Sequence, residues 1–440
     1  MSWRSSRVTA AEAAIPQPPV QVAPVPVEQP SAPARFRTLE PLRHRNFTLF
    51  WSGALVSNIG TWLQNVALSW LVWVITRSPF WVSMVTFCQF IPTLLFGLFG
   101  GLVADRLDRR RVLLVTQALA MGFATALAVV TWTGHARVAT LLPIIGAAGI
   151  AMAFNAPSFQ ALIPDLVPPR LILDAVALNS TQFSAARVVG PTLGAVFLAT
   201  AGAGWAFFAN ALTFLAVIGA LLAIRVPRHD PPSSAGARAL FGGVRVARES
   251  RAVSALLATT AVVSVFGAPV IVLLPVMAGQ VLHRNGAGFG ALFATFSVGA
   301  VAGALATGTV VRRFGMRRST AGGLALLSLL ILAFGLSRSV ALSSVILIGV
   351  GGVYTMSVSA TNSGLQTAVP PRKRGRVMSL YMMAWGGLFP IGGVAAGYIA
   401  THLGAPATLA ILSIPLMLGA AALAFVGPDY LSSPAASPVG

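Results

Sequence analysis

The sequence predicts an all-α protein that crosses a membrane about twelve times. Hydrophobic residues make up 56% of the 440 positions and charged residues only 9%, whereas a soluble domain carries charge at roughly a quarter of its positions. The apolar residues form runs of about 20 or more, the length that an α-helix needs to cross the hydrocarbon core while satisfying its own backbone hydrogen bonds. The basic residues lie in short tracts between these runs. These observations argue against a soluble globular protein.

Turn-forming or charged residues separate twelve apolar runs. The runs lie at about 48–75, 81–104, 112–133, 138–158, 176–201 and 204–225 in the first half, and at about 253–280, 287–311, 319–337, 340–361, 377–401 and 405–427 in the second. We therefore expect two six-helix bundles over 47–225 and 253–427, joined by a cytoplasmic linker over 226–252. Residues 1–46 are rich in Pro and Ala without the apolar core of a signal peptide, which predicts a disordered cytoplasmic tail. A second cytoplasmic tail is expected over 428–440.

The distribution of Lys and Arg predicts the orientation of the chain. If the N-terminal tail is cytoplasmic, 25 of the 30 basic residues fall on the cytoplasmic side and four on the opposite side, as the positive-inside rule expects. The remaining one, Arg187, lies inside an apolar run. One missed helix would invert every later loop, so this asymmetry supports both the number of spans and a cytoplasmic location of both termini. We expect a multi-pass protein of the cytoplasmic (inner) membrane.

The formal net charge of +20 points to a lipid surface and not to nucleic acid. Basic residues that bind nucleic acid cluster on a soluble domain, but here they are spread over loops that flank apolar runs, where anionic lipid headgroups are the fitting partner. We expect a monomer in the bilayer that has no nucleic-acid partner.

The sequence offers no group of residues suited to catalysis or metal binding. Cys88 is the single cysteine and lies in an apolar run, and no pair among the five histidines has the spacing of a metal site. Neither a nucleophile with its base nor a phosphate-binding loop is present. We expect a protein that is not an enzyme and that uses neither a metal nor a cofactor.

Two loops are repeated between the halves. Residues 101–111 read GLVADRLDRRR and residues 308–318 read GTVVRRFGMRR, at an offset of 207 residues. Residues 167–170 and 369–372 both read VPPR, at an offset of 202. Matched loops at nearly one spacing indicate two related six-helix halves, as transporters built from internal repeats have.

The loop after the second helix contains the pattern GxxxDRxxRR, formed by Gly101, Asp105, Arg106, Arg109 and Arg110. On this pattern the chain resembles the major facilitator superfamily, which implies two six-helix bundles that rock about a midplane site. A glycine lets another helix approach, a carboxylate caps a helix, and arginines can pair across the two halves, so we interpret the motif as a cytoplasmic gate. Arginines that only anchor the topology are the alternative. A second copy has an arginine in place of the acid and cannot latch in the same way; it comprises Gly308, Arg312, Arg313 and Arg317.

The fifth run contains the pattern GPxxG, formed by Gly190, Pro191 and Gly194, which is similar to a segment of the superfamily's exporters. Proline removes a helix hydrogen bond and glycine permits close packing, so the pattern indicates a bend at a helix contact, with ordinary packing as the alternative. The chain resembles the branch that includes the enterobactin exporter and the macrolide and drug efflux permeases. The resemblance implies export of a small molecule from the cytoplasm, commonly by proton antiport. It also rests on residues 58–73, 78–79, 90–92 and 177–180, and covers about 36–428.

Arg187 is the one ionised residue inside a predicted span, about three turns from the loop after the fourth helix. A charge at membrane depth is costly and usually faces a cavity or a partner. We therefore expect Arg187 to line the cavity and to bind an anionic or carbonyl-bearing part of the cargo. The alternative is a side chain that extends towards the cytoplasmic end of the helix.

The ten acidic residues provide no evident proton carrier. All of them lie in the tails, the linker or the cytoplasmic loops, and none at mid-membrane, where a proton antiporter is expected to keep its titrating group. Asp165, near the end of the fourth helix, is the nearest candidate, and Arg187 could control its protonation across two helices. A structural ion pair at the helix end is the alternative.

Polar and aromatic residues within the runs could line a central cavity that suits an amphipathic cargo. Each of them alone is more often a helix-to-helix hydrogen bond or an interfacial anchor. The set comprises Asn58, Gln64, Asn65, Trp70, Gln89, Asn155, Gln182, Tyr354, Asn362, Tyr381 and Trp385.

The sequence as a whole predicts a secondary active transporter that exports a small amphipathic compound, such as a drug, a macrolide or a siderophore. Export by proton antiport with alternating access is the first hypothesis. An uncoupled facilitator or an importer is the alternative, because no carboxylate lies at mid-membrane. A membrane-embedded enzyme or a receptor is the remote alternative.

Overall fold

The computed structural model describes residues 37–224 and 248–425, and nearly all of these residues are helical. Twelve of its helical spans are long and apolar enough to cross a membrane, which confirms the predicted number. The predicted linker and both tails lie mostly outside the described residues. Helical structure begins earlier than residue 47, because a short 3₁₀-helix, η1 (Arg37–Arg43), precedes the first span. Glu40 of η1 forms an ion pair with Arg170 at 3.1 Å.

The first bundle consists of six spans, and no π-helical segment interrupts their described residues. They are α1 (Arg45–Thr76), α2 (Pro79–Arg106), α3 (Arg109–Trp132), α4 (Val138–Leu162) with its extension η2 (Ile163–Leu166), α5 (Ile172–Thr200) after η3 (Pro169–Leu171), and α6 (Ala203–Ala223).

The second bundle differs because π-helical segments interrupt two of its spans. The seventh span joins α8 (Arg251–Val262), the π-segment η4 (Val263–Gly267), α9 (Pro269–Val276) and the π-segment η5 (Met277–Val281). The eleventh joins α13 (Pro371–Met382), the π-segment η6 (Met383–Gly387) and α14 (Leu388–Leu403). The uninterrupted spans are α10 (Gly286–Phe314), α11 (Met316–Leu336), α12 (Val340–Ala368) and α15 (Ala405–Phe425).

Small residues bring helices of one bundle into backbone contact. A Cβ added to Gly299 or Gly303 of α10 would collide with the carbonyl oxygens of Ile348 and Gly352 in α12. Without a hydrophobic driving force between helices in lipid, such close approach supplies the van der Waals contact that holds them together. The glycines of these two spans therefore fix the α10–α12 pair.

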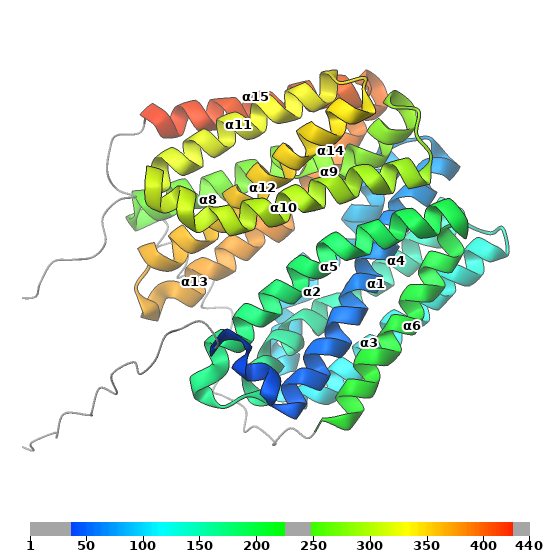
Figure 1. The fold of residues 1–440 in the computed structure, drawn as a ribbon, viewed down its shortest axis with the longest axis vertical. Helices are drawn as coiled ribbons and strands as arrows, with labels where there is room; N and C mark the ends of the chain where they lie inside the picture. Colours follow the sequence, from blue (N-terminus) through cyan, green and yellow to red (C-terminus); the bar gives the residue numbers. More distant parts are fainter. Residues whose placement is uncertain (1–36, 225–247, 426–440) are drawn as a thin grey trace, which may run out of the picture.

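The two bundles meet at one face of the molecule and separate towards the other. We call the face that carries the start of α1 and the loop between α2 and α3 the terminal face, and the other the opposite face. Figure 1 shows the bundles touching where α5 ends and α10 begins, and diverging towards the start of α5 and the end of α10. Near the opposite face Gly290 packs on Ala195, and the Phe80 amide donates to the Thr401 hydroxyl at 3.2 Å.

The buried apolar side chains follow the same division. One continuous cluster joins both bundles near the opposite face and includes Trp73, Phe289 and Ala400. Towards the terminal face the core splits into a cluster of the first bundle around Phe50 and a separate cluster of the second bundle around Leu256. The structure is therefore sealed on the opposite face and open between the bundles on the terminal face.

Candidate transport site

Arg187 lies near the midpoint of α5. The helix begins at Ile172 and ends at Thr200. Arg187 is therefore about four turns, or roughly 22 Å, from the start of the helix. This position is deeper than the sequence suggested, and too deep for the side chain to reach either surface of the membrane. The guanidinium carbon lies 5.3 Å from the ring centroid of Trp62 in α1. The geometry thus disfavours a side chain that extends to the interface.

The second bundle faces Arg187 with aromatic side chains. Tyr354 of α12 is only 4% exposed and is close enough to interact electrostatically with Arg187. Its hydroxyl is in hydrogen-bonding contact with Trp385 of η6. The guanidinium is therefore reached by Trp62 from the first bundle and by Tyr354 from the second, and Trp385, another predicted cavity residue, contacts the Tyr354 hydroxyl.

An aromatic row connects Trp62 to Tyr354. The ring centroids of Trp62 and Phe293 are 6.4 Å apart, those of Phe293 and Phe296 are 6.1 Å apart, and those of Phe296 and Tyr354 are 6.3 Å apart. Sequence reasoning did not select Trp62, Phe293 or Phe296. The recurrence of Phe289, Phe293 and Phe296 at helical spacing in α10 was the signal that could have found them.

Arg187 has no carboxylate partner in the part of the chain that the structure describes. Its Nε is buried and makes no hydrogen bond there. A cation over an aromatic face is worth about 2 kcal/mol or more when desolvated, whereas an unpaired charge at membrane depth costs from about 2.5–3.5 to more than 10 kcal/mol. The aromatic wall therefore does not supply the counter-charge that this cation needs.

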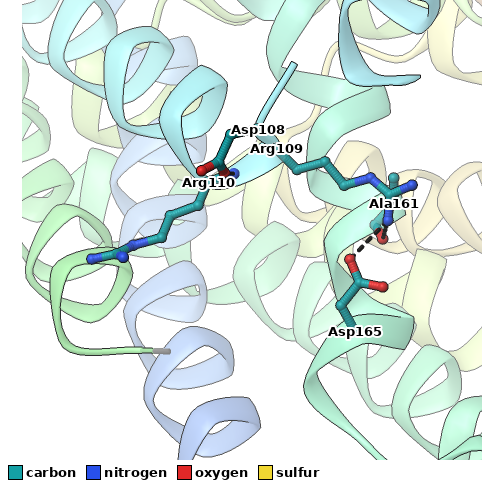
Figure 2. A network of polar contacts seen from close by, with 5 residues as sticks. All are labelled: Asp108, Arg109, Arg110, Ala161 and Asp165. Carbon is teal, nitrogen blue, oxygen red and sulfur yellow. Dashed lines mark hydrogen bonds and ion pairs between the residues drawn. The ribbon is translucent and has the colours of Figure 1, made fainter. Parts of the chain in front are cut away.

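Asp165 is paired with the gate motif. Its Oδ2 lies 2.7 Å from a terminal nitrogen of Arg109, which also donates to the Ala161 carbonyl at 3.0 Å (Figure 2). Both side chains are largely buried, at 17% and 9% exposure for Arg109 and Asp165. The suggested control of Asp165 by Arg187 is therefore replaced by an ion pair at the end of α4, the alternative that the sequence left open.

The arginines of the gate motif bond within the first bundle and not across the two bundles as the sequence suggested. Arg110 donates through Nε to the Leu221 carbonyl at 2.5 Å and through a terminal nitrogen to the Leu222 carbonyl at 2.9 Å, at the end of α6. Asp108 caps α3 by accepting from the Arg110 amide at 2.9 Å. Figure 2 shows Arg109 and Arg110 pointing in opposite directions. In this open state the two arginines tie α3 to its neighbours.

Gly101 has open space where we expected an approaching helix. No atom lies within 4 Å of a Cβ added there, whereas one added to its neighbour Gly100 would collide with the backbone of Ala153 in α4. Arg106 is exposed at the end of α2, and the side chain of Asp105 lies outside the described part of the chain. Both glycines lie within α2, which continues to Arg106, and the close helix contact is made by Gly100 instead of Gly101.

The second copy of the motif keeps one of these contacts and lacks another. Arg317, the repeat equivalent of Arg110, donates to the Ala424 carbonyl at the end of α15 at 3.1 Å. The position equivalent to Arg109 is Met316, whose sulfur would lie 3.3 Å from a Cβ on Gly364 of α12. The remaining members make local contacts: Arg312 donates to the Thr309 hydroxyl at 3.4 Å, Arg313 lies over Phe314 at 5.6 Å, and Gly308 faces only Arg312.

The GPxxG segment packs on α1. A Cβ on Gly190 would collide with the Trp62 side chain and lie 2.7 Å from the Ile59 carbonyl oxygen, and one on Gly194 would lie 3.2 Å from Val66. Pro191 is buried within α5. Because Trp62 is also the ring under Arg187, this contact sets the position of the guanidinium.

Most of the other predicted cavity residues are used within one bundle. Hydrogen bonds join Gln89 to Asn65 at 3.0 Å, Asn210 to Gln64 at 2.8 Å, Asn155 to Thr116 at 2.9 Å, and Gln366 to Asn362 at 2.6 Å. Tyr381 is 3% exposed and donates to the Val358 carbonyl at 3.4 Å. Trp70 stacks on Phe289 near the opposite face. Gln182 is 1% exposed, and its amide group makes no hydrogen bond within the described ranges. Asn58 is half-buried.

Comparison with known protein families identifies the chain. The model of the transmembrane secretion effector family, a branch of the major facilitator superfamily, matches residues 36–433. The chain belongs to this family. Its members are membrane transporters and not enzymes.

Curated relatives of this secretion effector are similar over most of their length. The staphyloferrin A transporter of Staphylococcus aureus is 24% identical over 83% of this chain and 92% of its own length. Macrolide efflux protein A of Streptococcus pyogenes is 24% identical over 81% and 90%. The enterobactin exporter of Escherichia coli is 26% identical over 77% and 81%.

Solved structures of other transporters share the fold of this secretion effector. A bacterial homologue of the lysosomal transporter Spinster, in an inward-facing unoccupied conformation, covers 89% of this chain and 97% of its own with a TM-score of 0.65 and 16% identity. The nucleoside transporter NupG covers 86% of this chain and 98% of its own with a TM-score of 0.66 and 12% identity. At such identities the likeness confirms the major facilitator fold.

Proposed function

We propose that this family member exports a small amphipathic compound from the cytoplasm, and that the anionic or carbonyl-bearing group of this compound binds Arg187. The observation that carries the proposal is the Arg187 guanidinium, which lies at mid-membrane between the two bundles over Trp62 and has no carboxylate partner among the described residues.

The surroundings of Arg187 support an amphipathic cargo. Trp62, Phe293 and Phe296 provide apolar faces on one side, and Tyr354, in contact with Trp385, provides a hydroxyl group. Large apolar walls with a few placed polar groups are typical of small-molecule sites. An anion or a carbonyl dipole would supply the counter-charge that the protein itself leaves out, while the rest of the cargo would lie on the rings.

The open terminal face supports loading from that side. The positive-inside distribution of Lys and Arg supports a cytoplasmic location of this face. A carrier that opens to the cytoplasm and has a cation at its centre is arranged to accept cargo for export. The direction agrees with the names of two relatives, an efflux protein and an exporter.

Release would require the bundles to close on the terminal face and to part on the opposite face. Among the described side chains no atom lies within 4 Å of a Cβ added to Gly101, which leaves room on α2 for a helix of the other bundle to approach. Rocking of two repeat-related bundles about a midplane site is the usual form of alternating access.

The family resemblance implies proton antiport, but the sequence has no carboxylate at mid-membrane that could carry the proton. Asp165 is engaged by Arg109, so it is not a free proton carrier beside the cargo. An uncoupled facilitator or an importer is the second candidate, and this observation favours it.

The test is uptake of charge-matched compounds into inverted membrane vesicles, in which export is seen as accumulation. A radiolabelled bile salt and a catecholate siderophore serve as anionic probes, and a macrolide serves as the cationic probe. We expect the anionic probes to accumulate in vesicles that contain the protein and not in vesicles without it. Equilibration without accumulation would indicate a facilitator, and uptake only into right-side-out vesicles would indicate an importer.

A further inference from the structure

The centre of the empty carrier holds one uncompensated positive charge. The complete sequence places no Asp, Glu or Lys, and no other Arg, in the middle of any span. The aromatic residues around Arg187 are uncharged. The empty site therefore carries one elementary charge at the midpoint of the membrane.

The membrane potential falls across the closed side of the carrier. Near the opposite face, Trp70 stacks on Phe289 with ring centroids 5.6 Å apart, and towards the middle of the spans Phe90 packs against Phe389 at 5.5 Å, each pair joining the two bundles. The buried apolar cluster is continuous between the bundles at this level and split below it. On the terminal side of Arg187, α5 is exposed at Ala177 and Thr181, so the site is connected to the terminal face in this state, and alternation would connect it to the other side.

Moving one elementary charge through 100 mV shifts an equilibrium by about 50-fold. A potential that is negative on the terminal face would stabilise the present open state of the empty carrier. A bound monoanion would neutralise Arg187, so the loaded carrier would turn without sensing the potential. One negative charge would leave the cytoplasm in each cycle, and the inside-negative potential would drive it.

We propose that the membrane potential acts on this transporter through Arg187, so that the empty carrier is voltage-sensitive and the export of an anion is electrogenic. The transport part of this inference rests on the proposed function, whereas the voltage sensitivity of the empty carrier does not. The inference explains how export against a gradient could be driven without a carboxylate at mid-membrane.

The experiment measures the voltage dependence of the empty carrier and needs no knowledge of the cargo. Cys88 is the single native cysteine, so Cys88→Ser gives a cysteine-free background. Ala177→Cys then places one thiol on α5, about five helical turns before Ala195 and therefore on the face that meets α10 near the opposite face. Ala177 is exposed in the open state and would be covered on closure of the terminal face.

The full chain is reconstituted in liposomes, and a membrane-impermeant maleimide added outside labels only those copies whose terminal face points outwards. A potassium gradient with valinomycin sets the potential. We expect an outside-positive potential of 100 mV to lower the labelling rate by up to about 50-fold relative to zero potential. Arg187→Lys keeps the charge and should keep this response, whereas Arg187→Gln should abolish it.

Two results would overturn the inference: a labelling rate that is equal at both polarities, or an undiminished voltage response in Arg187→Gln. Failure of the proposed function would look different. In that case the labelling would still follow the potential, but no anionic probe would accumulate in inverted vesicles. If the probes accumulated while labelling ignored the potential, the proposed function would stand without this inference.

Discussion

The two halves of the molecule have the same number of spans but different polar contacts. Arg110 and Arg317, at equivalent positions of the repeat, both donate to carbonyls at the end of the last helix of their bundle. Arg109 and Asp165 form an ion pair only in the first half, because the equivalent positions hold Met316 and Thr367. The repeat has kept the cap of the final helix and has lost the ion pair.

The halves also differ in the regularity of their helices. All π-helical segments among the described residues, η4, η5 and η6, belong to the second bundle. Gly279 of η5 packs on Trp73 and Gly387 of η6 packs on Leu94, both in the first bundle. π-segments interrupt the regular hydrogen bonding and are frequent at functional sites. The comparison indicates a firmly tied first bundle that carries the charge and a more deformable second bundle that supplies the aromatic wall.

The largest expected effect is a loss of stability on substitution of Gly190, which should exceed the loss at the repeat-equivalent Gly392. Gly190→Leu should lower the free energy of unfolding by about 3 kcal/mol or more, because the new side chain would meet both Trp62 and the α1 backbone. Gly392→Leu, at the equivalent position of the repeat, would meet the backbone of Val265 in η4 and should cost less, since the π-segment can shift. Thermal unfolding in detergent measures both.

Gly122→Leu on α3, where no atom lies within 4 Å of an added Cβ, is the matched control and should leave the melting temperature unchanged. Equal losses for Gly190→Leu and Gly392→Leu would contradict the difference in deformability.

The ion pair gives the next largest effect. Asp165→Asn should destabilise the protein by about 1–3 kcal/mol, because it leaves the largely buried Arg109 guanidinium without its counter-charge. Thr367→Asn at the equivalent exposed position should stay within about 0.5 kcal/mol. Thermal unfolding of the two variants measures the difference. Equal melting temperatures would show that the ion pair, which only the first half has, does not stabilise the protein.

Hydrogen exchange should distinguish the interrupted spans from the continuous ones. We expect amides of η4 and η6 to exchange roughly tenfold faster than those at the same depth in α1 and α5, because their backbone hydrogen bonding is irregular. Mass spectrometry of peptides from detergent-solubilised protein measures the rates. Uniform protection in both bundles would remove the proposed difference in deformability.

The smallest expected effect is the loss of stability when the arginine that caps the last helix is removed from either half. Arg110→Ala and Arg317→Ala each remove a cation from carbonyls at a helix C-terminus and should each cost about 0.3–1 kcal/mol. The two losses should agree within error when measured by thermal unfolding. A cost for one arginine several times larger than for the other would mean that the repeat is not symmetric even at this contact.

The sequence predicted the spans better than the contacts within the site. Spans follow from the length of an apolar run, which is a local property, so all twelve were found. The depth of Arg187 was underestimated because the charged Asp174 suggested a loop, whereas α5 already begins at Ile172. The pairing of Asp165 with Arg109 required knowledge of how α3 and α4 pack. Trp62 looks like an ordinary apolar residue until distant spans are brought together.

Transport of an anion and of its neutral analogue by Arg187 variants tests the central claim most directly. Inverted vesicles with matched amounts of wild type, Arg187→Lys and Arg187→Gln are supplied with a radiolabelled carboxylate-bearing amphiphile or with its uncharged methyl ester. The account predicts that Arg187→Gln loses at least about tenfold of the carboxylate flux relative to the ester, and that Arg187→Lys retains most of it. An unchanged ratio of the two fluxes in Arg187→Gln would contradict a role of Arg187 in binding the cargo.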